Sequence, residues 1–167
     1  MEVLILLGSA SDMEVGEEIA ATLDRFGVSY DLRITSAHRT PEKTKSLIRS
    51  AEEGGTRVII ACAGMSAHLA GVVAAETLLP VIGVPLAAGP LNGIDALLST
   101  VNMPGGVPVA TVSIGAKAGG KNAALLALRI IALSSRSLAE KLREFKTEMA
   151  LGVEEADRKF SKHSDHR

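Results

Sequence analysis

Five short apolar runs recur along the chain, and each is followed by a turn rich in glycine, serine or proline and then by a segment with helical spacing. The runs are Val3–Leu7, Val28–Ile34, Val58–Ala61, Val81–Val84 and Val107–Ile114. Three of them are almost uninterrupted, which is typical of parallel strands covered by helices on both faces. Strands that alternate with helices predict an α/β fold, with three αβα layers around a doubly wound, flavodoxin-like parallel sheet of five strands.

Residues that favour the start of a helix follow two of these runs. Ser11, with Glu14 three residues later, predicts a capping box, in which the serine side chain bonds a backbone N–H of the first helical turn. Thr40 followed by Pro41 predicts a helix that begins at the proline and has the threonine as its N-cap. Each signal therefore places a strand-to-helix loop directly before its helix.

The density of charge changes near residue 134. Residues 134–167 hold 15 charged side chains, and apolar side chains recur among them at three- and four-residue steps. This spacing predicts one long C-terminal amphipathic helix over residues 134–160, followed by a tail at residues 161–167. The helix packs either on its own domain or on a neighbouring subunit. We interpret the chain as a single domain in which residues 1–133 form the α/β core that carries the chemistry.

Composition narrows the possible functions. With a formal net charge of −1 and 2% aromatic residues over its 167 positions, the chain lacks both the basic surface and the stacking platforms that nucleic acids need. Its one cysteine, Cys62, cannot form an internal disulfide, and its four scattered histidines show no metal-ligand spacing. No apolar run approaches the ~20 residues that span a bilayer, and the first residues lack the basic region of a signal peptide. We expect a cytoplasmic protein without nucleic-acid, membrane or metal partners.

The predicted strand-to-helix loops collect the polar and glycine residues, at the edge of the sheet where such folds bind ligands. The first loop, Gly8–Asp12, offers backbone N–H groups and the hydroxyls of Ser9 and Ser11 at a helix N-terminus, which suits an anion. The carboxylate of Asp12 suits ribose hydroxyls instead. The alternative interpretation is that Ser11 or Asp12 only caps the helix.

The second and third loops carry groups that can transfer a proton. As a histidine, His38 can both give and take a proton, and its neighbour Arg39 can bind a phosphate through two hydrogen bonds. His68 follows the third strand, where it either contacts a ligand or only caps a helix. Cys62 lies among apolar residues at a strand end, and we interpret it as a core residue.

Five segments match a known enzyme family in order: Gly8–Asp12, Ser36–Pro41, Ala67–Leu69, Leu91–Gly93 and Met103–Val112. They resemble the bacterial-type N5-carboxyaminoimidazole ribonucleotide mutases of purine biosynthesis, and the resemblance spans roughly residues 3–133. Ser36–Pro41 and Met103–Val112 are long and specific blocks. Met65 stands where this family commonly has a glycine.

This resemblance implies an isomerase that uses neither metal nor cofactor. Such an enzyme moves a carboxylate from the exocyclic nitrogen of its ribonucleotide substrate to C4 of the imidazole, which gives 4-carboxy-5-aminoimidazole ribonucleotide. The family passes through aminoimidazole ribonucleotide and CO2 held together in a closed site. The resemblance also implies a homo-octamer, with the C-terminal helix reaching a neighbour and the active sites between subunits.

The same resemblance implies the roles of individual residues. His38 would be the general acid/base, which protonates the nitrogen as CO2 leaves and later removes the C4 proton. The implied substrate-binding residues are Ser9, Ser11, Asp12, Ser36, Arg39, Ala63, Gly64, His68 and Leu69. Of these, Ser9, Asp12 and Arg39 would bind the ribose and phosphate, and the residues of the second and third strand ends would line the imidazole and its carboxylate.

Three alternatives to the mutase remain open at this point. The nearest is an aminoimidazole ribonucleotide carboxylase that takes free CO2 directly, with the same fold and the same proton chemistry. A related carboxylase domain that acts on a pyridine nucleotide would carry an additional N-terminal region, which we do not expect here because the first predicted strand starts at Val3. A nucleotide-binding module without catalysis would keep Ser9, Asp12 and Arg39 but would have no need of His38.

Overall fold

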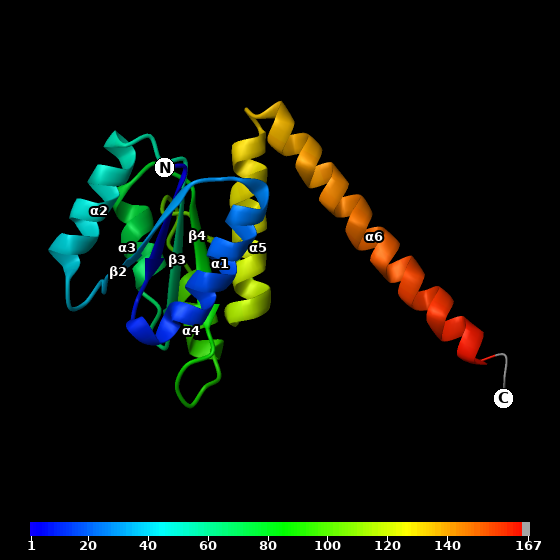
Figure 1. Cartoon of the computed structure of the whole chain (residues 1–167). Coiled ribbons are helices and arrows are strands. Elements are labelled where there is room, and N and C mark those ends of the chain that lie inside the picture. Colours follow the sequence, from blue (N-terminus) through cyan, green and yellow to red (C-terminus); the bar gives the residue numbers. More distant parts are fainter. Residues whose placement is uncertain (165–167) are drawn as a thin grey trace. The chain divides into compact units, whose positions relative to one another are not determined.

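The computed structural model describes residues 1–164, with side chains through residue 161. The chain divides into two compact units, Met1–Ile131 and Ala132–Arg167. In the first unit helices flank a sheet, and the second unit consists mainly of one long helix, α6 (Figure 1).

Five parallel strands form the sheet of the first unit, in the order β2-β1-β3-β4-β5. They are β1 Val3–Leu7, β2 Tyr30–Ile34, β3 Val58–Gly64, β4 Val81–Leu86 and β5 Ala110–Thr111. From β1 the chain moves outward to β2 and then returns to β3 on the other side of β1, so the direction of winding reverses between β1 and β3. This order confirms the predicted flavodoxin-like α/β fold and puts its ligand crevice at the carboxyl ends of these two strands.

Helices cover both faces of this sheet, as Figure 1 shows. The helices of the first unit are α1 Met13–Phe26, α2 Pro41–Glu53, α3 Leu69–Glu76, α4 Ile94–Val101 and α5 Ala116–Ala132, with a one-turn 3-10 helix, η1 Ala10–Asp12, before α1. On one face α1 and α5 approach closely because Gly120 has no side chain: a Cβ there would lie 3.2 Å from Cγ2 of Val15. On the opposite face lie α2 and α3, which share one apolar cluster with the sheet.

The central strands send alternate residues to the two faces, and each face packs on its own helices. Leu4 of β1 packs in one cluster with Ile48 of α2 and Val73 of α3. Leu7 of the same strand faces the opposite side of the sheet, where its Cδ1 would lie 3.0 Å from a Cβ added at Gly16 of α1. Since both faces are covered, every residue of β1 and the first five of β3 are buried. This burial explains why these runs are continuously apolar instead of alternating.

The strands that border the crevice agree with the sequence or extend beyond it. β1 has its predicted bounds, Val3–Leu7. β3 and β4 continue past the predicted ends at Ala61 and Val84, because they remain paired as far as Gly64 and Leu86. The additional residues bring β3 directly into the loop that precedes α3.

The start of β2 was predicted too early. The strand begins at Tyr30, not at Val28. Gly27 ends α1 in the left-handed conformation, with φ 73°, and the N–H of Val28 bonds the carbonyl of Leu23 at 3.1 Å. Val28 therefore belongs to the C-terminal cap of α1. It is buried there, which explains why an apolar residue occupies this position outside the strand.

The last strand is also shorter than predicted. β5 contains only Ala110–Thr111 instead of Val107–Ile114. Pro108 has no N–H to give to a ladder, and the N–H of Val107 is already used in a turn, where it bonds the carbonyl of Pro104 at 3.2 Å. An edge strand next to such a turn keeps few ladder bonds, although its sequence is apolar.

Of the two predicted helix caps, one is wrong and one is right in position only. Ser11 lies inside the additional turn η1, one residue before the N-cap position of α1, and the N–H of Ser11 bonds Ser9 Oγ. The predicted capping box with Glu14 therefore does not form. Thr40 does precede α2 as predicted. Its hydroxyl, however, makes no bond to the first turn of that helix and accepts the N–H of Ser36 instead, at 2.9 Å.

The second unit confirms the long C-terminal helix. α6 spans Arg136–Ser164 and thus continues past the predicted end at residue 160, while residues 165–167 lie outside the described part of the chain. Met149, Val153 and Phe160 are exposed and lie four and seven residues apart, along one side of the helix. The packing of this helix on another subunit stays a prediction.

Candidate active site

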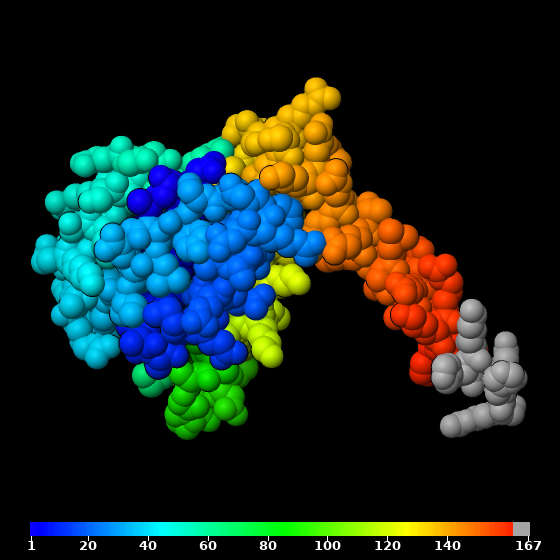
Figure 2. Space-filling view, in the orientation of Figure 1, coloured from blue at the N-terminus to red at the C-terminus, as the bar shows by residue number. Residues whose placement is uncertain are grey.

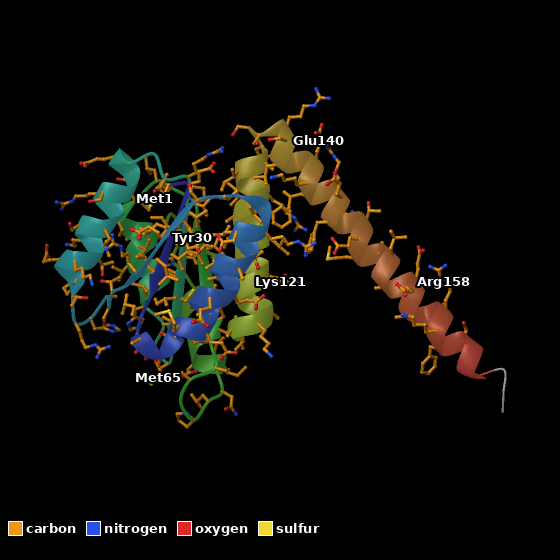
Figure 3. All side chains as sticks on the ribbon, viewed as in Figure 1. Met1, Tyr30, Met65, Lys121, Glu140 and Arg158 are labelled. Atoms are coloured by element: carbon orange, nitrogen blue, oxygen red, sulfur yellow. The ribbon has the colours of Figure 1, made fainter. Side chains whose placement is uncertain are left out.

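A cavity of about 550 Å³ lies where the loops after β1, β2 and β3 meet. These loops are at the carboxyl ends of the strands: in Figure 3, Met65, which follows β3, lies at the end of the sheet opposite Met1, which precedes β1. All site residues predicted from the sequence line this cavity, namely Ser9, Ser11, Asp12, Ser36, His38, Arg39, Ala63, Gly64, His68 and Leu69. The structure thus brings the candidate residues together, and their individual roles stay predictions.

The first loop forms a hydrogen-bonded group of polar side chains at η1. Ser11 Oγ lies 3.0 Å from Ser9 Oγ and 3.3 Å from Asp12 Oδ1. The N–H of Gly8 bonds the carbonyl of Cys62 at 2.9 Å, which ties the loop to the end of β3. The serine hydroxyls can donate and accept hydrogen bonds, and the carboxylate oxygens can accept them, which matches the donors and acceptors of sugar hydroxyls.

Asp12 is held in an environment that disfavours its charge. Partial burial raises the pKa of this carboxyl above its ordinary value of 3.8, although hydrogen bonds from Ser11 and Ser9 oppose the rise. Above pH 3.8 the unfolded chain loses this proton more readily than the folded chain does, so the carboxyl costs stability as the pH rises through that range.

We therefore expect Asp12→Asn to unfold at a higher temperature than the parent at pH 7, with an advantage that shrinks as the pH falls toward 3.8. Thermal unfolding at a series of pH values measures this difference. Because the asparagine oxygen can still accept from Ser11 Oγ, the local hydrogen bond is retained. An advantage of the same size at every pH would contradict the expected origin of the effect.

The second loop is a tight turn of residues 36–40. The N–H of Thr40 bonds the carbonyl of Ser36 at 2.9 Å, and the N–H of Arg39 lies 3.2 Å from Ser36 Oγ. His38 and Arg39 are exposed on this turn and line the cavity. No carboxylate among the described residues forms an ion pair with Arg39. Its guanidinium is therefore available to an anion that enters the cavity.

The two histidines of the cavity are hydrogen-bonded to each other. His38 Nε2 lies 2.7 Å from His68 Nδ1, and the rings meet edge to face at 74° with their centroids 4.9 Å apart. One nitrogen must carry a hydrogen and the other a lone pair, so this bond holds one proton between the two rings. His68 precedes α3 but makes no capping bond to that helix. Its ring thus serves the cavity, and the capping alternative for His68 is not what the structure has.

The third loop has an unusual backbone at Met65. This residue has φ 51°, in the left-handed region that favours glycine and that a methionine rarely adopts. The loop also touches the loop after β4: a Cβ at Gly64 would lie 2.6 Å from Cβ of Ala88, and one at Gly89 would lie 3.3 Å from Cγ of Met65. These two loops close one side of the cavity against each other.

Sequence reasoning missed part of the lining and included loops that lie elsewhere. The lining also contains Gly8, Ala37, Met65, Ser66 and Ala88. Except for Ala88, these residues neighbour predicted site residues in the same loops, and that adjacency could have found them. The segments Leu91–Gly93 and Met103–Gly106, which the sequence marks equally strongly, are not in the lining of this cavity in the described chain.

The described residues include no group of three His, Cys, Asp or Glu side chains placed to hold a metal ion. None of their helices is long and apolar enough to cross a bilayer. Cys62 is a fully buried free thiol, whose pKa is raised by that burial and also by the negative charge of Asp12. A thiol in this state is not a nucleophile near neutral pH, which confirms Cys62 as a core residue.

Comparison with known proteins decides the family. The family model described as AIR carboxylase matches residues 2–151. The chain belongs to the AIR carboxylase family. This family member is similar to the N5-carboxyaminoimidazole ribonucleotide mutase of Pyrococcus horikoshii, with 52% identity over 151 residues, which are 90% of this chain and 84% of that protein. It is also 52% identical to the Bacillus subtilis protein of the same name over 140 residues, 84% of this chain and 86% of that one.

Solved structures agree with this assignment. The crystal structure of Treponema denticola PurE superposes with a TM-score of 0.85 at 35% sequence identity, covering 94% of this chain and 96% of that one. The family suggested by the loop motifs is therefore confirmed, and so is the fold that the family implies.

Proposed function

We propose that this AIR carboxylase family member is an N5-carboxyaminoimidazole ribonucleotide mutase, an isomerase that makes 4-carboxy-5-aminoimidazole ribonucleotide in purine biosynthesis. The relatives that carry this name, about half identical over most of the chain, support the activity. The observation that carries the residue assignment is the 2.7 Å hydrogen bond between His38 and His68 at the cavity wall. Arg39, which forms no ion pair among the described residues, lines the same cavity.

In the proposed mechanism, His38 moves one proton twice. When the bond between the exocyclic nitrogen and its carboxylate breaks, the electron pair stays on the nitrogen, which takes a proton from His38 as CO2 is released. C4 of the imidazole then attacks CO2, and His38 removes the C4 proton so that the ring regains its aromaticity. His38 ends in its initial protonation state, and its bond to His68 keeps the ring at the cavity wall.

The rest of the cavity suits the two ends of such a substrate. Arg39 would bind the phosphate, and Ser9 and Asp12 would bind the ribose hydroxyls. The small residues at the end of β3, with Gly64 among them, let backbone groups approach the imidazole and its carboxylate. A tight cavity also keeps CO2 near the ring and limits the entry of water, which the decarboxylated intermediate requires.

The deciding experiment supplies two substrates separately. We expect efficient turnover of N5-carboxyaminoimidazole ribonucleotide, and slow turnover of aminoimidazole ribonucleotide with added CO2. Formation of the carboxylated product, followed by its ultraviolet absorbance, measures both rates. Efficient turnover of only the second pair would make the protein a carboxylase that takes free CO2. Turnover of neither, with retained binding of the product nucleotide, would leave a binding module.

We further propose that the protein assembles as a homo-oligomer, an octamer by its resemblance to the mutases. On α4, Ile94, Leu98 and Val101 are 53%, 52% and 50% exposed and follow one another at four- and three-residue steps. Figure 2 shows the green residues in and around α4 protruding at the lower edge of the first unit. An apolar stripe of this kind, together with the apolar side of α6, supports burial against other copies of the chain.

Light scattering tests this assembly. We expect a mass near eight times the 17.4 kDa of one chain, and a smaller species for Leu98→Glu, because a carboxylate cannot be buried in an apolar interface without large cost. Leu78→Glu is the matched control, since Leu78 is fully exposed and lies outside the stripe. A monomeric parent would refute the assembly, and equal effects of the two substitutions would refute the role of α4.

The same proposal places the enzyme in the cytoplasm. Its one cysteine, Cys62, is a free thiol in the core and not part of a disulfide, which agrees with a reducing compartment. Residues 1–133 are proposed to act as the catalytic core, and residues 134–160 as the helix that contacts neighbouring subunits.

A further inference from the structure

Two buried threonines lie beneath the turn that carries His38, although neither lines the cavity. Thr35 follows β2 and is 2% exposed, and Thr44 lies in the first part of α2 and is 0% exposed. Their hydroxyl oxygens are 2.9 Å apart. Thr35 Oγ1 is also 3.2 Å from Thr40 Oγ1. Buried hydroxyls are costly unless they are hydrogen-bonded, so this group needs an account of where each proton goes.

The hydrogen bonds of these hydroxyls connect both ends of the turn to α2. Thr40 Oγ1 donates to the carbonyl of Ser36 at 3.2 Å and accepts the N–H of Ser36 at 2.9 Å. Thr35 Oγ1 lies within hydrogen-bond distance of both Thr40 Oγ1 and Thr44 Oγ1 and can donate to either, and Thr44 Oγ1 donates to the backbone carbonyl of Thr40 at 3.2 Å. These bonds hold Ser36 through its N–H and its carbonyl, and Thr40 through its side chain and its carbonyl.

His38 sits at the middle of this turn and depends on its two ends. The turn has only five residues, and the bond from the N–H of Thr40 to the carbonyl of Ser36 closes it. His38 itself is exposed, and within residues 1–161 the side-chain hydrogen bond that holds its ring is the one to His68. Its position over the cavity is therefore set largely by the backbone that carries it.

We propose that Thr35 and Thr44 are positioning residues for the reaction: their buried hydroxyls fix the turn so that His38 meets both His68 and the substrate. This inference rests on the proposed function of His38 and extends it to residues that do not touch the substrate. A displacement of about 1 Å at a reacting group can cost up to about 100-fold in rate, so a hydroxyl outside the cavity can matter this much.

The test removes one hydroxyl and keeps the shape of the side chain. We expect Thr44→Val to lower kcat/KM by about 10- to 100-fold, and Thr44→Ser, which restores the hydroxyl, to stay near the parent. Thr100→Val is the matched control: Thr100 is 2% exposed and its hydroxyl bonds a carbonyl of its own helix, as that of Thr44 does, but it has no contact with the turn. It should lose a similar amount of stability and keep its activity.

A double-mutant cycle with His38→Asn separates positioning from a general loss of structure. If the hydroxyl acts through His38, then Thr44→Val lowers the residual rate of His38→Asn no further. An equal fractional loss in both backgrounds would overturn the proposal, and so would an unchanged rate of Thr44→Val in the parent. If Thr44→Val fails to fold, Thr35→Val removes the other half of the pair and takes the same place in the cycle. A fully active His38→Asn would instead defeat the proposed function, so the two failures are distinguishable.

Discussion

Replacing His38 by asparagine should lower turnover of N5-carboxyaminoimidazole ribonucleotide by about 10²- to 10⁴-fold, the range over which a general acid/base contributes to a rate. Asparagine keeps a polar side chain at this position, although its amide does not extend as far as Nε2, the histidine atom that bonds His68 Nδ1. It cannot take up and release a proton. The substitution therefore removes the proposed chemistry while it preserves much of the cavity wall.

Binding distinguishes this loss from damage to the site. Arg39, Ser9 and Asp12 are unchanged, so calorimetric titration with the product nucleotide should give a dissociation constant within a few-fold of the parent. The unfolding temperature should also remain near that of the parent, because His38 is exposed and contributes little to the core. A variant that turns over at the parent rate would remove His38 from the mechanism.

A large effect on stability is expected at Gly83, in the middle of β4. An added Cβ would lie 2.4 Å from Cγ2 of Thr100, 2.9 Å from Cγ1 of Val109 and 3.3 Å from Cβ of Ala70. The Thr100 side chain cannot simply turn away, because its hydroxyl bonds the carbonyl of Ala96 at 2.7 Å. Overpacking of this kind costs about 1–3 kcal/mol, and we expect Gly83→Ala to lower the free energy of unfolding by at least that much.

Denaturant titration at fixed protein concentration measures this loss, since assembly makes stability depend on concentration. Gly105→Ala is the matched control, because a Cβ at Gly105 would meet nothing within 4 Å. It should change the free energy of unfolding by less than about 0.5 kcal/mol. Combining Gly83→Ala with Thr100→Ser removes the clashing methyl and should recover part of the loss. If Gly83→Ala and Gly105→Ala have the same free energy of unfolding, the close packing of β4 on α4 does not contribute to stability as expected.

The gathering of the site residues was predictable because a parallel sheet places the loop after each strand at the same edge. Gly8–Asp12 and the turn with His38 follow β1 and β2, so their meeting with the loop after β3 needed only the alternation of strands and helices. Leu91–Gly93, which follows β4, and Met103–Gly106, which precedes β5, carry equally strong glycine and proline signals, but neither segment is in the lining of the cavity in the described chain. The sequence pattern does not show this difference.

Contacts between distant segments are what the sequence left open. His38 and His68 are 30 residues apart in the sequence. They follow β2 and β3, which lie on either side of β1 and end at the same edge of the sheet. The sequence also suggested helix caps at Ser11 and Thr40, since serine and threonine are good N-caps. In the structure, Ser11 Oγ instead bonds Ser9 Oγ at the cavity, and Thr40 Oγ1 accepts the N–H of Ser36 within the turn. Bonds within the loops thus replace the expected bonds to the helix ends.

The side chains around the cavity also determine what released CO2 can react with. CO2 combines readily with an uncharged primary amine, and no lysine of the described chain lines the cavity. Lys43, in the first part of α2, directs its ammonium to the carbonyl of Ile34 at 2.8 Å. In the proposed reaction, the released CO2 therefore meets C4 of the bound imidazole and no lysine amine. The enzyme carboxylates its substrate without forming a carbamate on its own lysines.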